Sequence, residues 1–125
     1  MTRVALRILF VDDGTAILRA VKRLLSSKAA HFEVFLADCA ANALAVMASE
    51  RVDVVVADYR MPNKNGLVFL TELSSSQPHI HRVLMTGEMF DVKASPDGPV
   101  QHLIAKPFAV SDLISLFETL SSTAT

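Results

Sequence analysis

The sequence predicts an α/β fold in which one parallel β-sheet carries helices on both of its faces. Short apolar segments rich in Val, Ile, Leu and Phe alternate along the chain with longer segments whose apolar residues recur at helical spacing. This alternation is typical of right-handed β–α–β crossovers, which place helices on both sides of a sheet. A length of 125 residues allows a single domain with five strands and about five helices.

The predicted strands are short apolar segments of four to six residues. Aliphatic residues and Phe predominate in them, as they do in strands that are buried on both faces of a parallel sheet. The predicted strands are Leu6–Val11, Phe32–Ala37, Val52–Ala57, Arg82–Met85 and His102–Ala105.

The predicted helices follow from apolar residues at helical spacing. The first, Thr15–Lys28, carries an apolar stripe that includes Val21 and Leu25. The others are a helix that Asp38 caps and that runs through Ala40 to Ser49, a helix over Gly66–Ser74, and a last helix that Ser111 caps.

The fourth crossover differs from the others in its proline content. Two prolines flank Asp-Gly in the stretch Ser95-Pro-Asp-Gly-Pro99, and this favours a turn over a full helix. We therefore expect the fourth helix to be short or irregular. The elements together fit a flavodoxin-like, doubly wound domain over residues 1–125, with a core at about residues 7–120 and a tail at 121–125.

Composition excludes several classes of function. Twelve Lys and Arg against thirteen Asp and Glu give a net charge of −1, which leaves no basic excess for a nucleic-acid surface. No apolar run approaches the roughly 20 residues of a membrane span, and no signal peptide is evident. The single cysteine, Cys39, excludes intramolecular disulfides and zinc sites built on several thiolates. We expect a soluble, cytoplasmic domain that binds neither nucleic acid nor membrane.

Polar residues follow four of the five predicted strands. Asp12 and Asp13 follow the first strand, Asp58 the third, Thr86 the fourth and Lys106 the fifth. The carboxyl ends of parallel strands form the ligand-binding edge of such a sheet, so we expect these side chains to converge. Three carboxylates repel one another, and a hard divalent cation together with the lysine would offset that repulsion. Carboxylates, Mg²⁺, a lysine and a hydroxyl can together handle a phosphoryl group.

The motifs at these strand ends resemble those of the receiver domain of bacterial two-component response regulators. The similarity extends from about Arg7 to Leu120. It rests on Ile8-Leu-Phe-Val-Asp-Asp13, Asp58-Tyr-Arg-Met-Pro-Asn-Lys-Asn-Gly66, Thr86-Gly87 and Lys106-Pro107-Phe108. The resemblance implies the strand order 2-1-3-4-5. It also implies a signalling switch that accepts a phosphoryl group and dephosphorylates itself, and not an enzyme that turns over an outside substrate.

Carried over residue by residue, the resemblance makes Asp58 the phosphoryl acceptor. Asp13 and Asp58 would bind Mg²⁺ through carboxylates and Arg60 through its backbone carbonyl, while Asp12 would act through a bound water. Because Asp58 is ionised at neutral pH, it needs no general base to attack phosphorus. Mg²⁺ is therefore the expected cofactor.

The remaining family positions concern the phosphoryl oxygens and the entrance to the site. Thr86 would hydrogen-bond one phosphoryl oxygen and Lys106 would pair with another, and the Lys106-Pro107 peptide bond is cis in relatives. At two variable positions beside the acceptor, Arg60 and Glu88 have opposite charges and could form a salt bridge that shields the phosphoryl group from water, whereas Gly87 leaves the entrance uncrowded. We also expect Gly66 to relieve the backbone at the start of the third helix, and the Met61-Pro62 pair to shape the loop over the site.

Two features depart from the family and affect switching. Leu103 stands three residues before the lysine, where many receivers carry a Tyr or Phe that moves together with the threonine. The stretch Ser95–Pro99 lies where the family's fourth helix builds the signalling face. We therefore expect a muted switch, concentrated in residues 87–100.

The resemblance implies a sensor histidine kinase or a phosphotransfer protein as the phosphoryl donor, together with an effector of unknown identity. A homodimer through the face of helix four, strand five and helix five is a candidate assembly. Two alternatives stay open: a receiver that no longer switches and serves for docking, and a small Mg²⁺-dependent phosphatase with an aspartate nucleophile. A flavin-binding protein is disfavoured, because Asp12 and Asp13 stand where its phosphate loop would lie.

Overall fold

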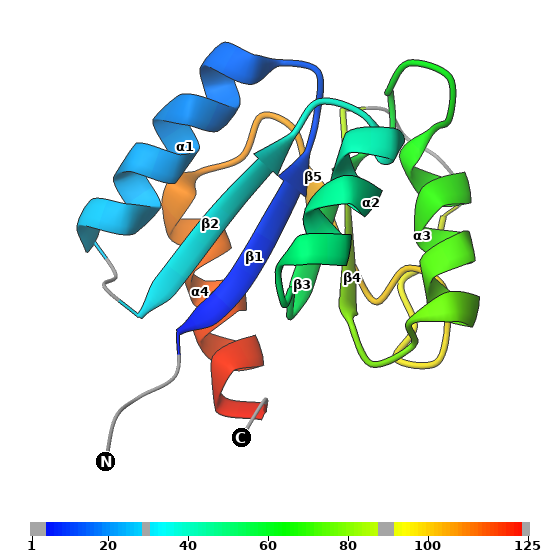
Figure 1. Cartoon of the computed structure of the whole chain (residues 1–125). Coiled ribbons are helices and arrows are strands. Elements are labelled where there is room, and N and C mark those ends of the chain that lie inside the picture. Colours follow the sequence, from blue (N-terminus) through cyan, green and yellow to red (C-terminus); the bar gives the residue numbers. More distant parts are fainter. Residues whose placement is uncertain (1–4, 29–30, 88–91, 124–125) are drawn as a thin grey trace.

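The computed structural model describes residues 5–28, 31–87 and 92–123 (Figure 1). These residues form one five-stranded parallel sheet with the order β2-β1-β3-β4-β5, which confirms the predicted fold class and strand order. The elements are β1 (Leu6–Val11), α1 (Thr15–Lys28), β2 (Phe32–Ala37), α2 (Ala40–Ser49), β3 (Val54–Asp58), α3 (Gly66–Ser76), β4 (His81–Thr86), β5 (His102–Ala105) and α4 (Val110–Thr123).

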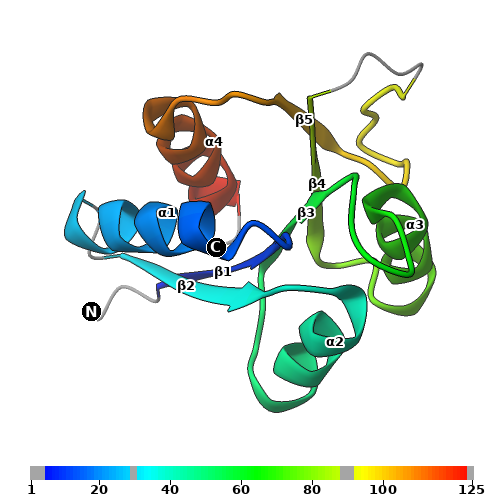
Figure 2. The same cartoon turned by 90° about the horizontal axis from the view of Figure 1, so that it is seen from above.

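Helices cover both faces of the sheet. Figure 2 shows α1 and α4 on one face and α2 and α3 on the other. Because strand side chains alternate between faces, the core divides into two clusters. Phe10, on the α1/α4 side, meets the ring of Phe117 edge-on at 5.9 Å, and neighbouring Leu9 is buried on the α2/α3 side with Phe69. No helix in the described ranges is long and apolar enough to cross a membrane.

The register of the sheet brings the strand ends into line. Val11 of β1 aligns with Ala37 of β2 and with Ala57 of β3. Thr86 of β4 aligns with Ala105 of β5. Residues that follow β1, β3 and β5 therefore leave the sheet at one edge, which lies at the top of Figure 1.

The predicted element ranges are close to the observed ones, but the prediction that Asp38 caps α2 is wrong. Cys39 occupies the N-cap position and makes no side-chain capping bond. Asp38 stands one residue too early to reach the free amides, and its carboxylate accepts a hydrogen bond from the Asn42 side chain instead. That bond lowers the pKa of Asp38. β3 begins at Val54, later than predicted, and includes Asp58.

The last helix also differs from its prediction at both ends. α4 begins at Val110, so Ser111 is its second residue and not its cap. The Ala109 carbonyl accepts the first hydrogen bonds, from the amides of Asp112 and Leu113. The helix continues to Thr123, so residues 121–123, expected as a tail, are helical.

The described part of the fourth crossover, residues 92–101, contains a turn and no helix, as the two prolines predicted. The sequence did not predict what holds it. Arg82 is 4% exposed, and its guanidinium donates to the carbonyls of Ile80, Pro78, Gly98 and Pro99 at 2.9–3.0 Å. Gln101 accepts from the Arg82 amide and donates to the Pro96 carbonyl, both at 3.0 Å. These side chains hold residues 92–101 in place without a helix.

Candidate functional site

A polar pocket of about 880 Å³ opens at the carboxyl ends of β1, β3 and β5. It combines acidic residues that follow β1 and end β3, the loop after β3, and the lysine that follows β5. The lining residues are Asp12, Asp13, Gly14, Asp58, Tyr59, Arg60, Met61, Pro62, Asn65 and Lys106.

Main-chain hydrogen bonds at the strand ends position the acidic residues. The Asp12 amide donates to the Ala37 carbonyl at 3.0 Å, so Asp12 extends the β1–β2 ladder by one residue. Its own carboxylate accepts the Gly14 amide at 3.0 Å and turns the chain toward α1. Asp58 is the last residue of β3 and aligns with Met85 of β4. The sheet thus fixes the backbones from which both carboxylates project.

The three carboxylates that were predicted to converge do so. One oxygen each from Asp12, Asp13 and Asp58 lies within 4.8 Å of the others. Asp12 and Asp58 are buried, whereas Asp13 is exposed at the mouth of the pocket. Carboxylate oxygens are the donors that hard divalent cations prefer, so this cluster could hold such an ion.

Lys106 neutralises part of this charge. Its ammonium lies 2.9 Å from Asp12 Oδ2 and 3.1 Å from Asp58 Oδ2, and so bridges the ends of β1 and β3. Burial alone would lower the pKa of Lys106, but its hydrogen bonds to the two carboxylates outweigh burial and raise that pKa. The lysine therefore remains a cation in the pocket.

The two buried carboxylates differ in their proton affinity. Burial opposes the charged form of Asp12, yet the Gly14 amide and the Lys106 ammonium outweigh it and lower the pKa of Asp12. Burial also opposes ionisation of Asp58, and with the adjacent charge of Asp12 it raises the pKa of Asp58 despite Lys106. Of the two buried carboxylates, Asp58 therefore has the higher proton affinity.

Other predicted site residues lie around this cluster. Thr86 ends β4 outside the pocket lining, and its carbonyl accepts the Lys106 amide at 2.9 Å. The Lys106-Pro107 peptide is cis, as the resemblance implied. A Cβ at Gly87 would lie 3.6 Å from the Lys106 Cβ, so this glycine borders the lysine. Leu103 is 41% exposed on β5.

Only one partner of the expected salt bridge between Arg60 and Glu88 lies within the described residues. Arg60 is exposed and lines the pocket, but Glu88 lies outside the ranges that the structure describes.

Sequence reasoning missed how the loop after Asp58 is held. Asn65 caps α3 by accepting the Val68 amide at 2.8 Å, and it also lines the pocket. Asn63 has a φ of 70°, a left-handed conformation that asparagine tolerates. The Lys64 ammonium pairs with Glu72 of α3. An Asn directly before an apolar helix is a signal that could have identified this cap.

Comparisons with known sequences agree with this site. A family model of the response regulator receiver domain matches residues 8–118. The response regulator MprA of Mycolicibacterium vanbaalenii is 32% identical over 116 residues, covering 91% of this chain and 49% of that protein. MprA of Mycobacterium avium is 31% identical over 117 residues, covering 92% and 50%. The chain thus spans about half the length of the curated relatives that it matches.

Solved structures show the same architecture. The signal receiver domain of an HD domain-containing protein from Pseudomonas fluorescens superposes with a TM-score of 0.82 at 28% identity, covering 98% of this chain and 90% of that chain. A CheY-like receiver domain protein from Methanospirillum hungatei gives a TM-score of 0.81 at 25% identity, with coverages of 97% and 99%. Because the family match, the strand order and the aspartate–lysine cluster fall on the same residues, the chain belongs to the family of two-component response regulator receiver domains.

Proposed function

We propose that this chain accepts a phosphoryl group on Asp58 in a Mg²⁺-dependent reaction and thereby changes a protein-interaction face. The observation that carries this proposal is the Lys106 ammonium, placed 3.1 Å from Asp58 and 2.9 Å from Asp12 beside a third carboxylate. A carboxylate nucleophile held next to a fixed cation and a cation-binding cluster has what phosphoryl transfer requires, namely positioning and charge neutralisation.

In the proposed reaction an Asp58 carboxylate oxygen attacks phosphorus in line. An oxygen–phosphorus bond forms as the donor's bond to phosphorus breaks, and the leaving group takes the bonding electron pair. A histidine kinase or a phosphotransfer protein would present the donor as a phosphohistidine. Lys106 would pair with a phosphoryl oxygen, and the Thr86 hydroxyl would donate to another.

The acidic cluster suits Mg²⁺ because it offers hard oxygen donors at an open pocket mouth. Asp13 and Asp58 would hold the ion through their carboxylates and Arg60 through its backbone carbonyl, with Asp12 acting through a water. When bound, Mg²⁺ would neutralise charge on the transferred group. We expect weak, reversible binding that Asp13→Ala weakens strongly, as measured by Mg²⁺ titration, whereas Asp112→Ala on α4 leaves it unchanged.

Hydrolysis of the aspartyl phosphate would return the domain to its resting state. Water would approach through the mouth of the pocket, where the lining residues Asp13 and Arg60 are exposed. This would make the chain a self-resetting switch without turnover of an outside substrate. The effector and any homodimer through the β5 side of the domain remain part of this proposal.

The direct test is incubation with acetyl phosphate and Mg²⁺, followed by intact-mass measurement. We expect one phosphoryl group per chain, none in Asp58→Asn, and none after Mg²⁺ is chelated. Asp112→Asn, which removes an exposed acid remote from the pocket, should be labelled like the wild type. Full labelling of Asp58→Asn would overturn the assignment. A folded wild type that is never labelled would favour the docking-module alternative, and repeated turnover of a phosphomonoester would favour the phosphatase.

A further inference from the structure

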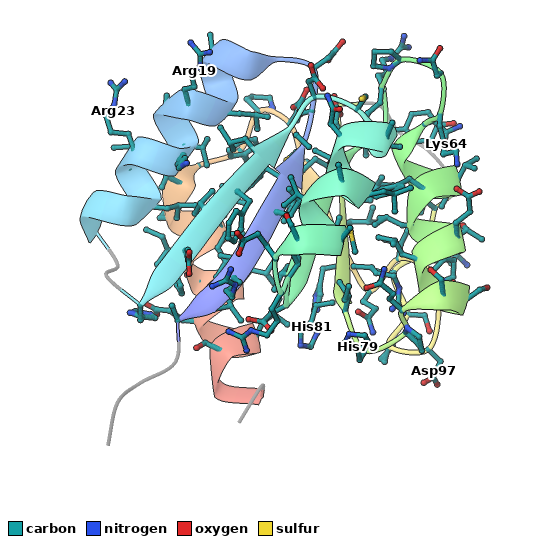
Figure 3. The ribbon with its side chains drawn as sticks, viewed as in Figure 1. Arg19, Arg23, Lys64, His79, His81 and Asp97 are labelled. Carbon is teal, nitrogen blue, oxygen red and sulfur yellow. The ribbon has the colours of Figure 1, made fainter. Side chains whose placement is uncertain are left out.

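Two histidines lie at the end of the sheet opposite the acidic pocket. His81 begins β4 and His102 begins β5, and both are half-buried. His102 aligns with Val83, and His81 precedes Val83 by two residues on the same strand. Since strand side chains alternate, both histidines project from one face and are diagonal neighbours across the β4–β5 ladder. Figure 3 shows His81 at the lower end of the sheet, away from the loop that carries Lys64.

Among the residues that the structure describes, little negative charge faces this pair. The Asp53 carboxylate, before β3, is shared between the Arg7 amide at 2.9 Å and Arg51 at 3.6 Å. Arg82, directly after His81, adds a buried positive charge whose hydrogen bonds go to neutral main-chain carbonyls.

Within the described residues, the elements that pack around His102 add no buried acid, and Asp97 of the crossover is exposed. The two acidic residues of α4 are Asp112 and Glu118, and both are exposed. Asp112 lines the same groove as His102, and Lys93 of the crossover is exposed and basic.

The electrostatics agree with this placement. Burial lowers the pKa of His81, and the nearby His102 and Arg82 act in the same direction against Asp53. Burial also lowers the pKa of His102. The closed sheet therefore holds both imidazoles neutral at neutral pH.

β5 is the shortest strand of the described sheet and one of its two edge strands. It has four residues and pairs only with β4. Its start is tied by the Gln101 amide to the Arg82 carbonyl at 2.9 Å, and its end by the Lys106 amide to the Thr86 carbonyl at 2.9 Å. Release of β5 would separate His102 from His81 and return it to water. An open state would then take up protons at about pH 6.5, the ordinary range of histidine.

We propose that His81 and His102 make the pairing of β5 sensitive to protons, so that β5 stays paired with β4 at neutral pH and opens as the pH falls. The open state binds protons more tightly, so its population rises up to about tenfold per pH unit for each histidine below that range. Opening would withdraw Lys106, which directly follows β5, from Asp12 and Asp58. The functional meaning of this withdrawal rests on the proposed phosphoryl acceptance, whereas the release of β5 itself needs no phosphodonor.

The test is amide hydrogen exchange at about pH 7.5 and about pH 5.5, without phosphodonor, expressed as protection factors that correct for the intrinsic effect of pH. In the wild type we expect protection over His102–Ala105 to fall about tenfold or more, while β1 and β3 keep theirs. The double variant His81→Gln/His102→Gln should show nearly equal β5 protection at both pH values. His79→Gln, at an exposed histidine just before β4, should behave like the wild type.

Three results would overturn the proposal. One is a wild type whose β5 protection does not respond to pH. Another is an equal loss over β1, β3 and β5, which would indicate global unfolding. The third is a double variant that loses as much β5 protection as the wild type, because another group would then be responsible. If the double variant does not fold, His102→Gln alone replaces it, and the wild-type comparison of β5 with β1 still decides. Failure of Asp58 phosphorylation would leave all of these readings intact.

Discussion

A Cβ atom at Gly66 would lie 2.3 Å from the carbonyl oxygen of Asp58 and 2.9 Å from its carbonyl carbon. Gly66 is the first residue of α3, and its amide donates to the Tyr59 carbonyl at 2.9 Å. The helix therefore begins in direct contact with the backbone of the proposed acceptor. The φ of Gly66 is not positive, so its backbone conformation does not require glycine. The requirement comes from this close approach.

We predict that Gly66→Ala lowers the free energy of unfolding by about 1–3 kcal/mol, since the methyl group must push α3 away from β3. Urea denaturation measures the loss. Gly98→Ala is the matched control, because a Cβ there meets its nearest atom at 3.4 Å, and we expect a change within about 1 kcal/mol. Equal losses at the two positions would contradict the close-packing explanation.

A second prediction concerns Lys106, whose side chain is 30% exposed. Lys106→Met leaves Asp12 and Asp58 facing each other without a cation, and we expect it to cost about 1–3 kcal/mol of stability at neutral pH. Lys64→Met removes an ammonium that pairs with exposed Glu72, and it should cost less than about 0.5 kcal/mol. Urea denaturation of both variants makes the comparison.

The loss in Lys106→Met should depend on pH in a defined direction. Asp12 has a lowered pKa in the folded protein, so its stabilising contribution is present above its ordinary value of 3.8 and is lost as the pH falls further. Asp58 has a raised pKa, so it accepts a proton early in the same titration and its repulsion with Asp12 disappears. The stability difference between wild type and variant should therefore shrink from about pH 7 to about pH 3. A difference that grows on acidification would refute this electrostatic account.

A third prediction concerns residues 92–101, the described part of the fourth crossover. Arg82→Met removes the donor to four main-chain carbonyls, and unsatisfied buried acceptors are costly, so we expect a loss of about 3 kcal/mol. Arg23→Met on the exposed side of α1 (Figure 3) should change stability by less than about 0.5 kcal/mol. Thermal or urea unfolding compares the two, and similar small losses would mean that Arg82 does not hold the crossover.

A fourth prediction concerns switching. Leu103 is 41% exposed and has no ring to move inward when Thr86 and Lys106 bind a phosphoryl group. With Mg²⁺ and beryllofluoride, which mimics that group, we expect exchange changes mainly over residues 87–100 and small ones along β5. Asp58→Asn, treated in the same way, should show neither change. Strong new protection across Leu103–Leu120, with residues 87–100 unaffected, would place the switch elsewhere.

The sheet and most of the pocket could be predicted because they depend on repeated, local signals. Apolar runs identified the strands, and parallel register then placed whatever follows Val11, Ala57 and Ala105 at one edge. Asp58 and Lys106 meet for this reason, although 48 residues separate them in the chain.

The features that could not be predicted depend on single hydrogen bonds or on distant partners. The caps assigned to Asp38 and Ser111 failed because a shift of one or two residues decides which amides a side chain can reach. Arg82 lies in a predicted strand, and its sequence neighbours do not indicate that its guanidinium donates to carbonyls 16 and 17 residues away. The steric need for Gly66 is equally invisible, since it arises from the Asp58 backbone.

The central claim, that Asp58 is the phosphoryl acceptor, is tested most directly by locating the modification. After reaction with acetyl phosphate and Mg²⁺, borohydride reduction converts an aspartyl phosphate into homoserine, and peptide mass spectrometry identifies the converted residue. The account predicts homoserine at position 58 alone, with Asp12 and Asp13 unchanged and no conversion when Mg²⁺ is chelated. Conversion at Asp12 or Asp13, with Asp58 intact, would contradict it.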